Sequence, residues 1–252
     1  MAGHAAVAAL LLRFAYPRMG AARKRVVMQW WSAKLLRILN VSARVEGAIP
    51  HEGDRAAMVA ANHVSWLDIF VISSARPTRF IAKSEIRDWP IAGWIAEEAG
   101  TLFMRRNEWR DTVRSTQRVH DALAGGDCVG LFPEGITTEG DTLLKFHSSL
   151  FEAAVGNAAH VYPVAIRYET PQGGPCREVS FAGDRTFMQS LALIIRQRAV
   201  IVKIDFAKPI DAQRATRRDV ASQARARVAS LLGLETAGTG PAGSSGRPGS
   251  PP

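Results

Sequence analysis

The sequence predicts an α/β domain with a mostly parallel central sheet flanked by helices. Three observations predict this class: the chain of 252 residues is 47% hydrophobic and 22% charged, short strand patterns alternate with helical patterns, and the strand patterns are apolar at almost every position. Strands that are apolar throughout are typical of parallel sheets, which are buried on both faces. We therefore expect helices to cover both sides of one sheet.

The expected elements follow one another from residue 43 to residue 232. Strands are expected at 43–46, 56–61, 78–82, 100–104, 127–132, 159–168, 177–181 and 199–206. Helices are expected at 66–75, 90–98, 108–124, 148–156, 187–196 and 213–232. In the helix at 108–124, Val113, Val119 and Leu123 share one face, and Gly125-Gly126 ends it. Ligand sites in such sheets gather beyond the carboxyl ends of the strands, so the residues after each strand are the candidates.

The chain divides into a basic segment at 1–42, the α/β domain at 43–234 and a tail at 235–252. The tail is rich in Gly, Pro and Ser and cannot bury apolar area, so we expect it to be disordered. No apolar run approaches the ~18 residues of a spanning helix, which excludes a polytopic membrane protein. The two cysteines, Cys128 and Cys176, are too few for a disulfide framework or a zinc ribbon and favour a reducing compartment.

The N-terminal segment is strongly basic. Residues 1–44 hold eight basic side chains and no acidic ones, which accounts for nearly all of the net charge of +9. The rest of the chain has 24 basic and 23 acidic side chains, which almost cancel. A localised basic segment indicates attraction to a polyanion, either a nucleic acid or an anionic membrane surface.

The apolar residues between these charges favour a membrane. Val27, Trp31, Leu35 and Ile38 recur at helical spacing within residues 26–39. A short helix that combines tryptophan, leucine and basic residues suits the lipid interface, so we expect the segment to dock onto an anionic bilayer. The alternative is a helix that packs on the domain and has a basic outer face. A nucleic-acid arm is disfavoured because such arms have little aliphatic surface, and a signal peptide because the charges follow the first apolar run.

The first candidate site is the segment at 60–70. A buried strand ends at Asn62-His63, and Ser65 and Asp68 then have the spacing of a helix cap. One interpretation is that Asp68 only caps the helix. Across a strand-to-helix turn, however, its carboxylate can also meet His63. A histidine oriented by a carboxylate is a general base for removing a proton from a hydroxyl.

Three further segments follow strands. Glu134 and Gly135 come after the strand at 127–132, so we expect them beside the same cleft, although Pro and Gly there also suit a plain turn. Arg106 follows the strand at 100–104, where a guanidinium can bind phosphate oxygens or simply face solvent. Pro163 lies inside an apolar run and suggests a strand edge or a bulge.

Together, these segments resemble the four sequence blocks of the glycerolipid acyltransferase family, which includes the 1-acyl-sn-glycerol-3-phosphate acyltransferases. The resemblance covers roughly residues 26–210. Its NHxxxxD block matches Asn62, His63 and Asp68; its second block resembles Gly100, Phe103, Met104 and Arg106; its FPEG block matches Phe132, Pro133, Glu134 and Gly135; and its last block matches Val161, Pro163, Val164 and Ile166.

The resemblance implies acyl transfer from a thioester, on coenzyme A or acyl carrier protein, to the hydroxyl of a lysolipid. His63 takes the hydroxyl proton in this scheme, Asp68 holds the imidazole, and amides near Ser65 steady the oxyanion. No bound cofactor, metal or cysteine nucleophile is implied. The resemblance also implies a peripheral or monotopic enzyme at the cytoplasmic face of the inner membrane. The residues expected to bind substrate are Asn62, Arg106, Glu134, Gly135, Lys145 and His147.

The sequence departs from the family where the acceptor headgroup is expected. Ile136 and Thr137 follow the FPEG block, and His147 stands where many phosphate-using members have lysine, with Lys145 two positions earlier. The leading expectation is a 1-acyl-sn-glycerol-3-phosphate acceptor that gives phosphatidate. The alternatives are a lyso-ornithine lipid or another lyso-aminolipid acceptor, a hydrolase that uses Ser65, and a lipid-binding protein without activity. No G-x-S-x-G elbow surrounds Ser65, which argues against the hydrolase.

Overall fold

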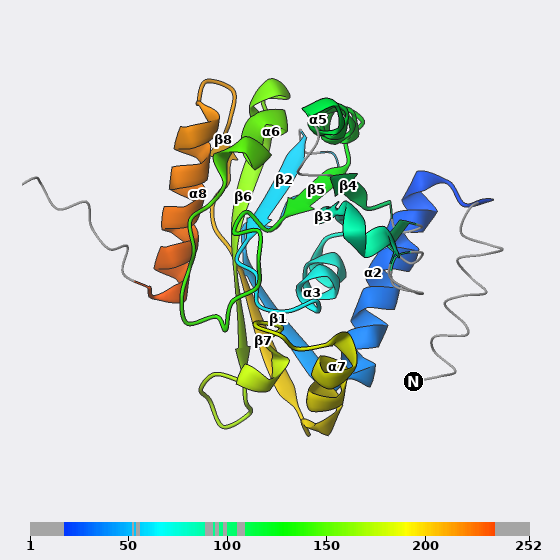
Figure 1. Cartoon of the computed structure of the whole chain (residues 1–252), viewed down its shortest axis with the longest axis vertical. Helices are drawn as coiled ribbons and strands as arrows, with labels where there is room; N and C mark the ends of the chain where they lie inside the picture. Colours follow the sequence, from blue (N-terminus) through cyan, green and yellow to red (C-terminus); the bar gives the residue numbers. More distant parts are fainter. Residues whose placement is uncertain are drawn as a thin grey trace, which may run out of the picture.

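The structure is a computed structural model that describes residues 18–51, 53, 56–88, 93, 96–97, 100–104 and 109–234, with the backbone alone for residues 109–115. These residues form a central sheet with helices on both sides (Figure 1). The strands are β1 (Val41–Gly47), β2 (Ala57–Ala61), β3 (Arg79–Lys83), β4 (Leu102–Met104), β5 (Cys128–Leu131), β6 (His160–Glu169), β7 (Val200–Phe206) and β8 (Ile210–Asp211). The helices are α2 (Ala21–Ile38), α3 (Asp68–Ala75), α5 (Trp109–Ala124), α6 (Glu152–Gly156), α7 (Phe187–Arg196) and α8 (Arg217–Leu232). The short 3₁₀ helices are η3 (Ser84–Asp88), η4 (Ser148–Phe151) and η5 (Arg177–Val179).

The sheet is mixed: parallel pairs predominate among the described strands, as expected from the sequence, and the antiparallel pairs are confined to β6. Its strand order is β1-β7-β6-β2-β5-β3-β4, with β8 also beside β6. Within the described part of the chain, β7 and β8 run antiparallel to β6 and the other paired strands are parallel. The reversal arises because β7 starts beside the end of β6, where Ile201 pairs with Glu169. The connection through α7 therefore does not return to the opposite edge of the sheet, as a parallel crossover must.

Both faces of the sheet are buried, as the apolar strand patterns predict. Alternate residues of β2 contribute to two separate core clusters: Val59 packs in the cluster that includes residues of α2, α3 and α7, and Met58 in the cluster that includes residues of α5, α6 and α8. Figure 1 shows the same division, with α2, α3 and α7 on one side of the sheet and α6 and α8 on the other. The α/β class is confirmed.

Helix α2 packs on the domain, as the alternative interpretation of the N-terminal segment expects. Ser32 and Leu36 are its buried residues, and the side-chain amide of Gln29 donates to the backbone carbonyls of Ser74 and Ala75 at the end of α3, at 3.1 and 3.2 Å. Trp30 lies on the outer surface of the helix and is 51% exposed. No helix among the described residues is long and apolar enough to cross a membrane. Residues 1–17, the tail from 235 and most of the helix expected at 90–98 lie outside the described residues.

The strand expected at 177–181 is wrong, because residues 177–179 form the 3₁₀ helix η5. The chain pairs with β6 only briefly, through the bridge from Glu169 to Pro175. If this antiparallel pairing continued along β6, the segment after Pro175 would lie beside Ile166. The side chain of Asn62 already bonds both the N–H and the carbonyl of Ile166, at 2.8 and 3.0 Å, so no partner remains there for a further strand.

Pro163 lies inside β6 and not at an edge strand, since β6 pairs with β2 on one side and with β7 and β8 on the other. On that second side β7 ends opposite Val164, where Phe206 pairs with it, and β8 begins opposite Val161, where Ile210 pairs with it. The proline thus lies between the two partner strands. Its missing N–H costs no ladder bond there, and its carbonyl still accepts from Ala207 N at 2.9 Å.

Candidate active site

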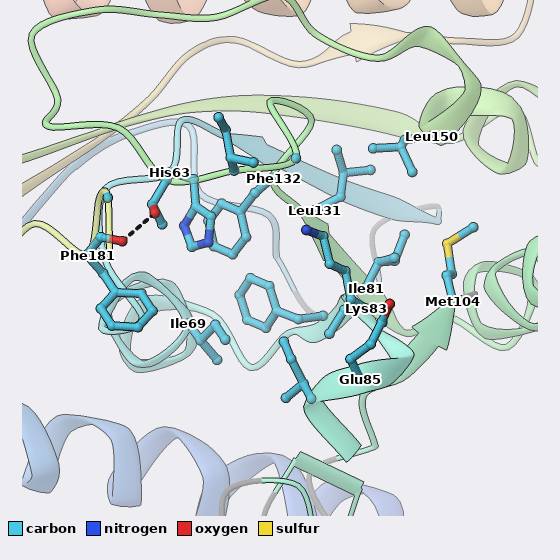
Figure 2. Close-up of a pocket in the computed structure, with 17 residues that line it drawn as sticks. His63, Ile69, Ile81, Lys83, Glu85, Met104, Leu131, Phe132, Leu150 and Phe181 are labelled. Atoms are coloured by element: carbon cyan, nitrogen blue, oxygen red, sulfur yellow. Dashed lines mark hydrogen bonds between the residues drawn. The ribbon is translucent and has the colours of Figure 1, made fainter. Parts of the chain in front are cut away.

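The candidate site lies where β2 and β5 end side by side. The two strands are parallel neighbours, with Ala60 opposite Leu131, so the segments that follow them leave the sheet at the same edge. A cavity of about 590 Å³ opens beside them (Figure 2). Its lining is mostly apolar, and His63 from the β2 segment and Phe132 from the β5 segment both face it. The expectation that these two segments share one cleft is confirmed.

The ring of His63 is fixed by stacking. It lies parallel to the Phe132 ring, with centroids 3.9 Å apart and an interplanar angle of 9°, and Phe132 in turn stacks on Phe80 at 5.5 Å. The His63 side chain is 20% exposed. A stacked imidazole cannot rotate freely about its side-chain bonds, so its two nitrogens keep fixed directions.

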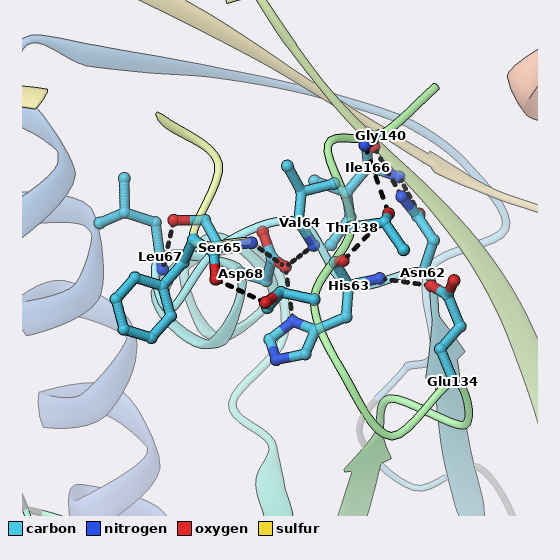
Figure 3. A network of polar contacts seen from close by, with 12 residues as sticks. Asn62, His63, Val64, Ser65, Leu67, Asp68, Glu134, Thr138, Gly140 and Ile166 are labelled. Atoms are coloured by element: carbon cyan, nitrogen blue, oxygen red, sulfur yellow. Dashed lines mark hydrogen bonds and ion pairs between the residues drawn. The ribbon is translucent and has the colours of Figure 1, made fainter. Parts of the chain in front are cut away.

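His63 and Asp68 are in direct contact, as the spacing predicts. The Nδ1 atom of His63 lies 2.9 Å from Oδ2 of Asp68 (Figure 3). With Nδ1 engaged by the carboxylate, Nε2 is the ring nitrogen that remains to act on a substrate. An imidazole oriented in this way can accept a proton from a hydroxyl group, because the carboxylate stabilises the imidazolium form that results.

Asp68 is fully buried, at 0% exposed, and its carboxylate is bonded on both oxygens. Oδ2 also accepts from the backbone N–H groups of Val64 and Ser65, at 2.8 and 2.9 Å. Oδ1 accepts from the hydroxyl of Tyr168 in β6, at 2.7 Å. Sequence reasoning missed Tyr168. Its only signal is that it shares a face of β6 with other buried residues, which does not name its partner.

Two details of the turn differ from the sequence analysis. Helix α3 begins at Asp68, and the Asp68 carboxylate caps the turn by accepting from Ser65 N, while the Ser65 hydroxyl lies 3.4 Å from Leu67 N. Amides near Ser65 were expected to steady an oxyanion at the helix start. Those of Val64 and Ser65 donate to Asp68, so these two are already engaged.

Glu134 holds the backbone around His63. Its two oxygens accept from His63 N and Leu144 N, at 2.9 and 2.8 Å, and it is only 4% exposed. Burial raises the pKa of this carboxyl above its ordinary value, although the two backbone donors oppose that rise. Thr138 N donates to the His63 carbonyl at 2.8 Å. The segment after β5 therefore bonds both the backbone N–H and the backbone carbonyl of His63. This makes Glu134 a positioning group for His63.

The remaining predicted substrate-binding residues are spread around the site. Gly135 lines the cavity, with a φ of 78° that favours glycine. Asn62 is buried and joins β2 to β6 through Ile166. Lys145 and His147 are exposed and are not among the cavity-lining residues. Arg106 lies outside the described residues.

The thiols are not activated. Burial raises the pKa of Cys128, and burial together with Glu178 raises the pKa of Cys176 to about 11. No group of three or more His, Cys, Asp or Glu side chains in the described part of the chain has the arrangement of a metal site.

Comparisons with known proteins identify related chains. The model of a family described as "Acyltransferase" matches residues 42–167, which contain His63, Asp68 and Glu134. The lyso-ornithine lipid O-acyltransferase of Pseudomonas aeruginosa is 38% identical over 200 residues, covering 79% of this chain and 76% of that protein. The 1-acyl-sn-glycerol-3-phosphate acyltransferase of Neisseria gonorrhoeae is 38% identical over 177 residues, covering 70% and 69%. The crystal structure of the 1-acyl-sn-glycerophosphate acyltransferase PlsC from Thermotoga maritima has the same fold, with a TM-score of 0.62, 22% identity, and coverage of 92% and 95%.

Proposed function

We infer the reaction from the family: the chain belongs to the acyltransferases and is an acyltransferase of lysolipids. We propose that the acyl donor is a thioester on coenzyme A or acyl carrier protein. The acceptor hydroxyl would enter the cavity beside His63, whose apolar lining suits lipid chains. The observation that supports this proposal best is the contact of His63 with the buried carboxylate of Asp68 at the cavity wall.

The proposed step is a direct transfer with no covalent enzyme intermediate. Nε2 of His63 removes the proton of the lysolipid hydroxyl while its oxygen attacks the thioester carbonyl, forming a C–O bond. The C–S bond then breaks, and the imidazolium returns its proton to the leaving thiolate. Asp68 stabilises the imidazolium between these two transfers. The raised pKa values of Cys128 and Cys176 agree with a scheme in which neither thiol attacks.

Thioester turnover with and without a lysolipid tests this function. A transferase releases thiol only when the acceptor hydroxyl is present, and the acyl group is recovered in a two-chain lipid. Thiol release without any acceptor would indicate a hydrolase, and no release with either acceptor class would indicate a lipid-binding protein. Either result would overturn the proposal.

We propose 1-acyl-sn-glycerol-3-phosphate as the acceptor, which makes the product phosphatidate. A lyso-ornithine lipid is the second candidate, favoured by His147 in place of a phosphate-binding lysine and by the lyso-ornithine lipid acyltransferases among the relatives. Assays of the purified enzyme with each acceptor, at equal thioester, separate the two. A kcat/KM higher for the lyso-ornithine lipid would overturn the phosphatidate assignment and leave the transferase assignment intact.

Arg106 is expected to act on the acceptor. If its guanidinium pairs with the acceptor's anionic headgroup, Arg106→Ala raises the KM for the lysolipid by about tenfold and leaves the KM for the thioester unchanged, since each lost charge-assisted bond costs about 1.5–3 kcal/mol. Initial rates with each substrate varied in turn measure the two constants. Arg118→Ala, an arginine of α5, serves as the control. A rise confined to the thioester would place Arg106 at the carrier instead.

We also propose that the enzyme docks onto the anionic cytoplasmic face of the inner membrane through α2. Among the described residues, the large apolar side chains that are exposed belong to α2, α7 and the segment after β5, and none belongs to α6 or α8. Helix α2 has no acidic residue, and the Nζ atom of Lys34 lies 4.7 Å from the centroid of the exposed Trp30 ring. A basic surface with an exposed indole is typical of helices that lie in the lipid interface.

The indole is expected to provide the salt-resistant part of binding. Each basic side chain near an anionic surface contributes about 1 kcal/mol, and salt screens it over a Debye length of ~8–10 Å. We therefore expect the Trp30→Ala variant to bind anionic vesicles as the parent does at low salt. At high salt it should lose most of this binding, as measured by co-sedimentation. The control is Leu231→Ala, which removes a half-buried apolar side chain from α8, on the other side of the sheet. Equal sedimentation of parent and both variants with neutral and anionic vesicles would contradict docking through α2.

A further inference from the structure

Tyr168 makes a contact with the site that none of the proposed roles uses. Its hydroxyl donates to Oδ1 of Asp68 at 2.7 Å, across 100 positions of sequence. The residue lies in β6 opposite Val202 of β7, so a central strand of the sheet fixes its backbone. It is 5% exposed, and Asp68 is 0% exposed. Solvent therefore cannot replace this hydroxyl without a rearrangement of the core.

We propose that Tyr168 is a positioning residue that sets the strength of the Asp68–His63 pair. The inference rests on the proposed role of His63 as the general base. The two oxygens of Asp68 have different partners: Oδ2 is bonded to His63 and to two backbone amides, whereas Oδ1 is bonded to Tyr168. The backbone amides hold the carboxylate in place whatever stands at position 168. The hydroxyl adds a hydrogen bond that stabilises part of the carboxylate's negative charge. Without this bond, the full charge would act on His63.

The hydroxyl remains a donor under all conditions of turnover. Burial, the charge of Asp68 and the hydrogen bond to it raise the pKa of Tyr168 well above its ordinary value. Other titratable groups near the pair include Glu134, which accepts from His63 N and faces the backbone of His63, and Lys83 and Glu85, which line the same cavity as His63. Glu134 is bonded to His63 N and Leu144 N, so a change at Tyr168 leaves its partners in place.

The direction of the effect follows from the charge. Tyr168→Phe removes the donor from Oδ1, so Asp68 holds more negative charge and stabilises the imidazolium form of His63 more strongly. His63 then stays protonated to higher pH, and the acidic limb of the kcat/KM profile moves to higher pH. We expect kcat/KM at a fixed pH on this limb to fall about tenfold, the size associated with one hydrogen bond to a charged group, and to recover at higher pH, with the KM for the lysolipid unchanged.

A matched control separates this role from simple packing. Tyr162 lies on the same strand and in the same core cluster, and it is also 5% exposed. Tyr162→Phe likewise removes a buried hydroxyl but leaves the Oδ1 contact of Asp68 intact. We expect it to leave the acidic limb where it is in the parent. A limb that moves equally in both variants, or in neither, would overturn the inference.

A second substitution tests the sign without removing the side chain. Site-specific 3-fluorotyrosine at position 168 keeps the size of the ring and makes the hydroxyl a stronger donor, so the acidic limb is expected to move to lower pH. Opposite shifts for the fluorinated chain and for Tyr168→Phe support the inference, and shifts of the same sign overturn it. His63→Ala, assayed in parallel, distinguishes the two failures. If that variant is active, the general-base proposal itself is wrong; if it is inactive and the limbs do not move, only the role of Tyr168 is wrong.

Discussion

Replacing His63 with alanine is expected to abolish acyl transfer and to leave the fold intact. General-base catalysis contributes about 10²–10⁴-fold to rate, and the change removes the imidazole that stacks on Phe132 and pairs with Asp68. The backbone bonds of His63, from its N–H to Glu134 and from Thr138 N to its carbonyl, do not involve the ring and survive the change. Initial rates of thiol release with saturating lysolipid measure the loss.

The fold of the His63→Ala chain needs its own measurement. The substitution leaves a gap against Phe132, so some loss of thermal stability is expected, but the core clusters on both faces of the sheet remain. Phe132→Leu is the matched control, since it removes the same stacking contact and keeps the imidazole. If Phe132→Leu loses as much activity as His63→Ala, packing and not proton transfer explains the effect. Activity of His63→Ala within a few-fold of the parent would refute the general-base role.

The contact between His63 and Asp68 could be predicted from sequence because both residues belong to one short turn. His63 and Asp68 are separated by five positions at the end of a strand, and local geometry alone decides whether they meet. The meeting of the β2 and β5 segments was also predictable, because neighbouring parallel strands end at one edge.

The partners of the pair could not be predicted in the same way. Tyr168 reaches Asp68 only because β6 lies directly beside β2, and that neighbour relation is a property of the whole sheet. The role of Asn62 is similar. Its amide occupies the positions on Ile166 that another strand would use. This bond pattern explains why residues 177–181 do not form the strand expected from the sequence. A side chain that takes the place of a strand in bonding the backbone does not change the hydrophobic periodicity of the sequence, so the sequence does not reveal it.

Replacing Asp68 with asparagine is expected to lower kcat by about 10²–10⁴-fold while the geometry of the site is retained. The reason lies in the three donors around Oδ2, which are Nδ1 of His63 and the amides of Val64 and Ser65. The carboxamide oxygen of the variant must take that position, because its NH₂ group would face three donors. Its NH₂ group then faces the Tyr168 oxygen, which can accept. The imidazole keeps its orientation and loses only the negative charge that stabilises its protonated form.

Two further variants test whether charge is the cause. Asp68→Ala removes both the charge and the bonds, so it should lose at least as much activity as Asp68→Asn and also lower the thermal stability of a site that is otherwise fully bonded. The double variant His63→Ala/Asp68→Asn should be no slower than His63→Ala alone, because a carboxylate that acts through an imidazole has no effect once the imidazole is gone. Residual rates measured with the same lysolipid and thioester decide the point. If the losses of the two single variants multiply in the double variant, Asp68 acts on the reaction independently of His63, and the paired mechanism is wrong.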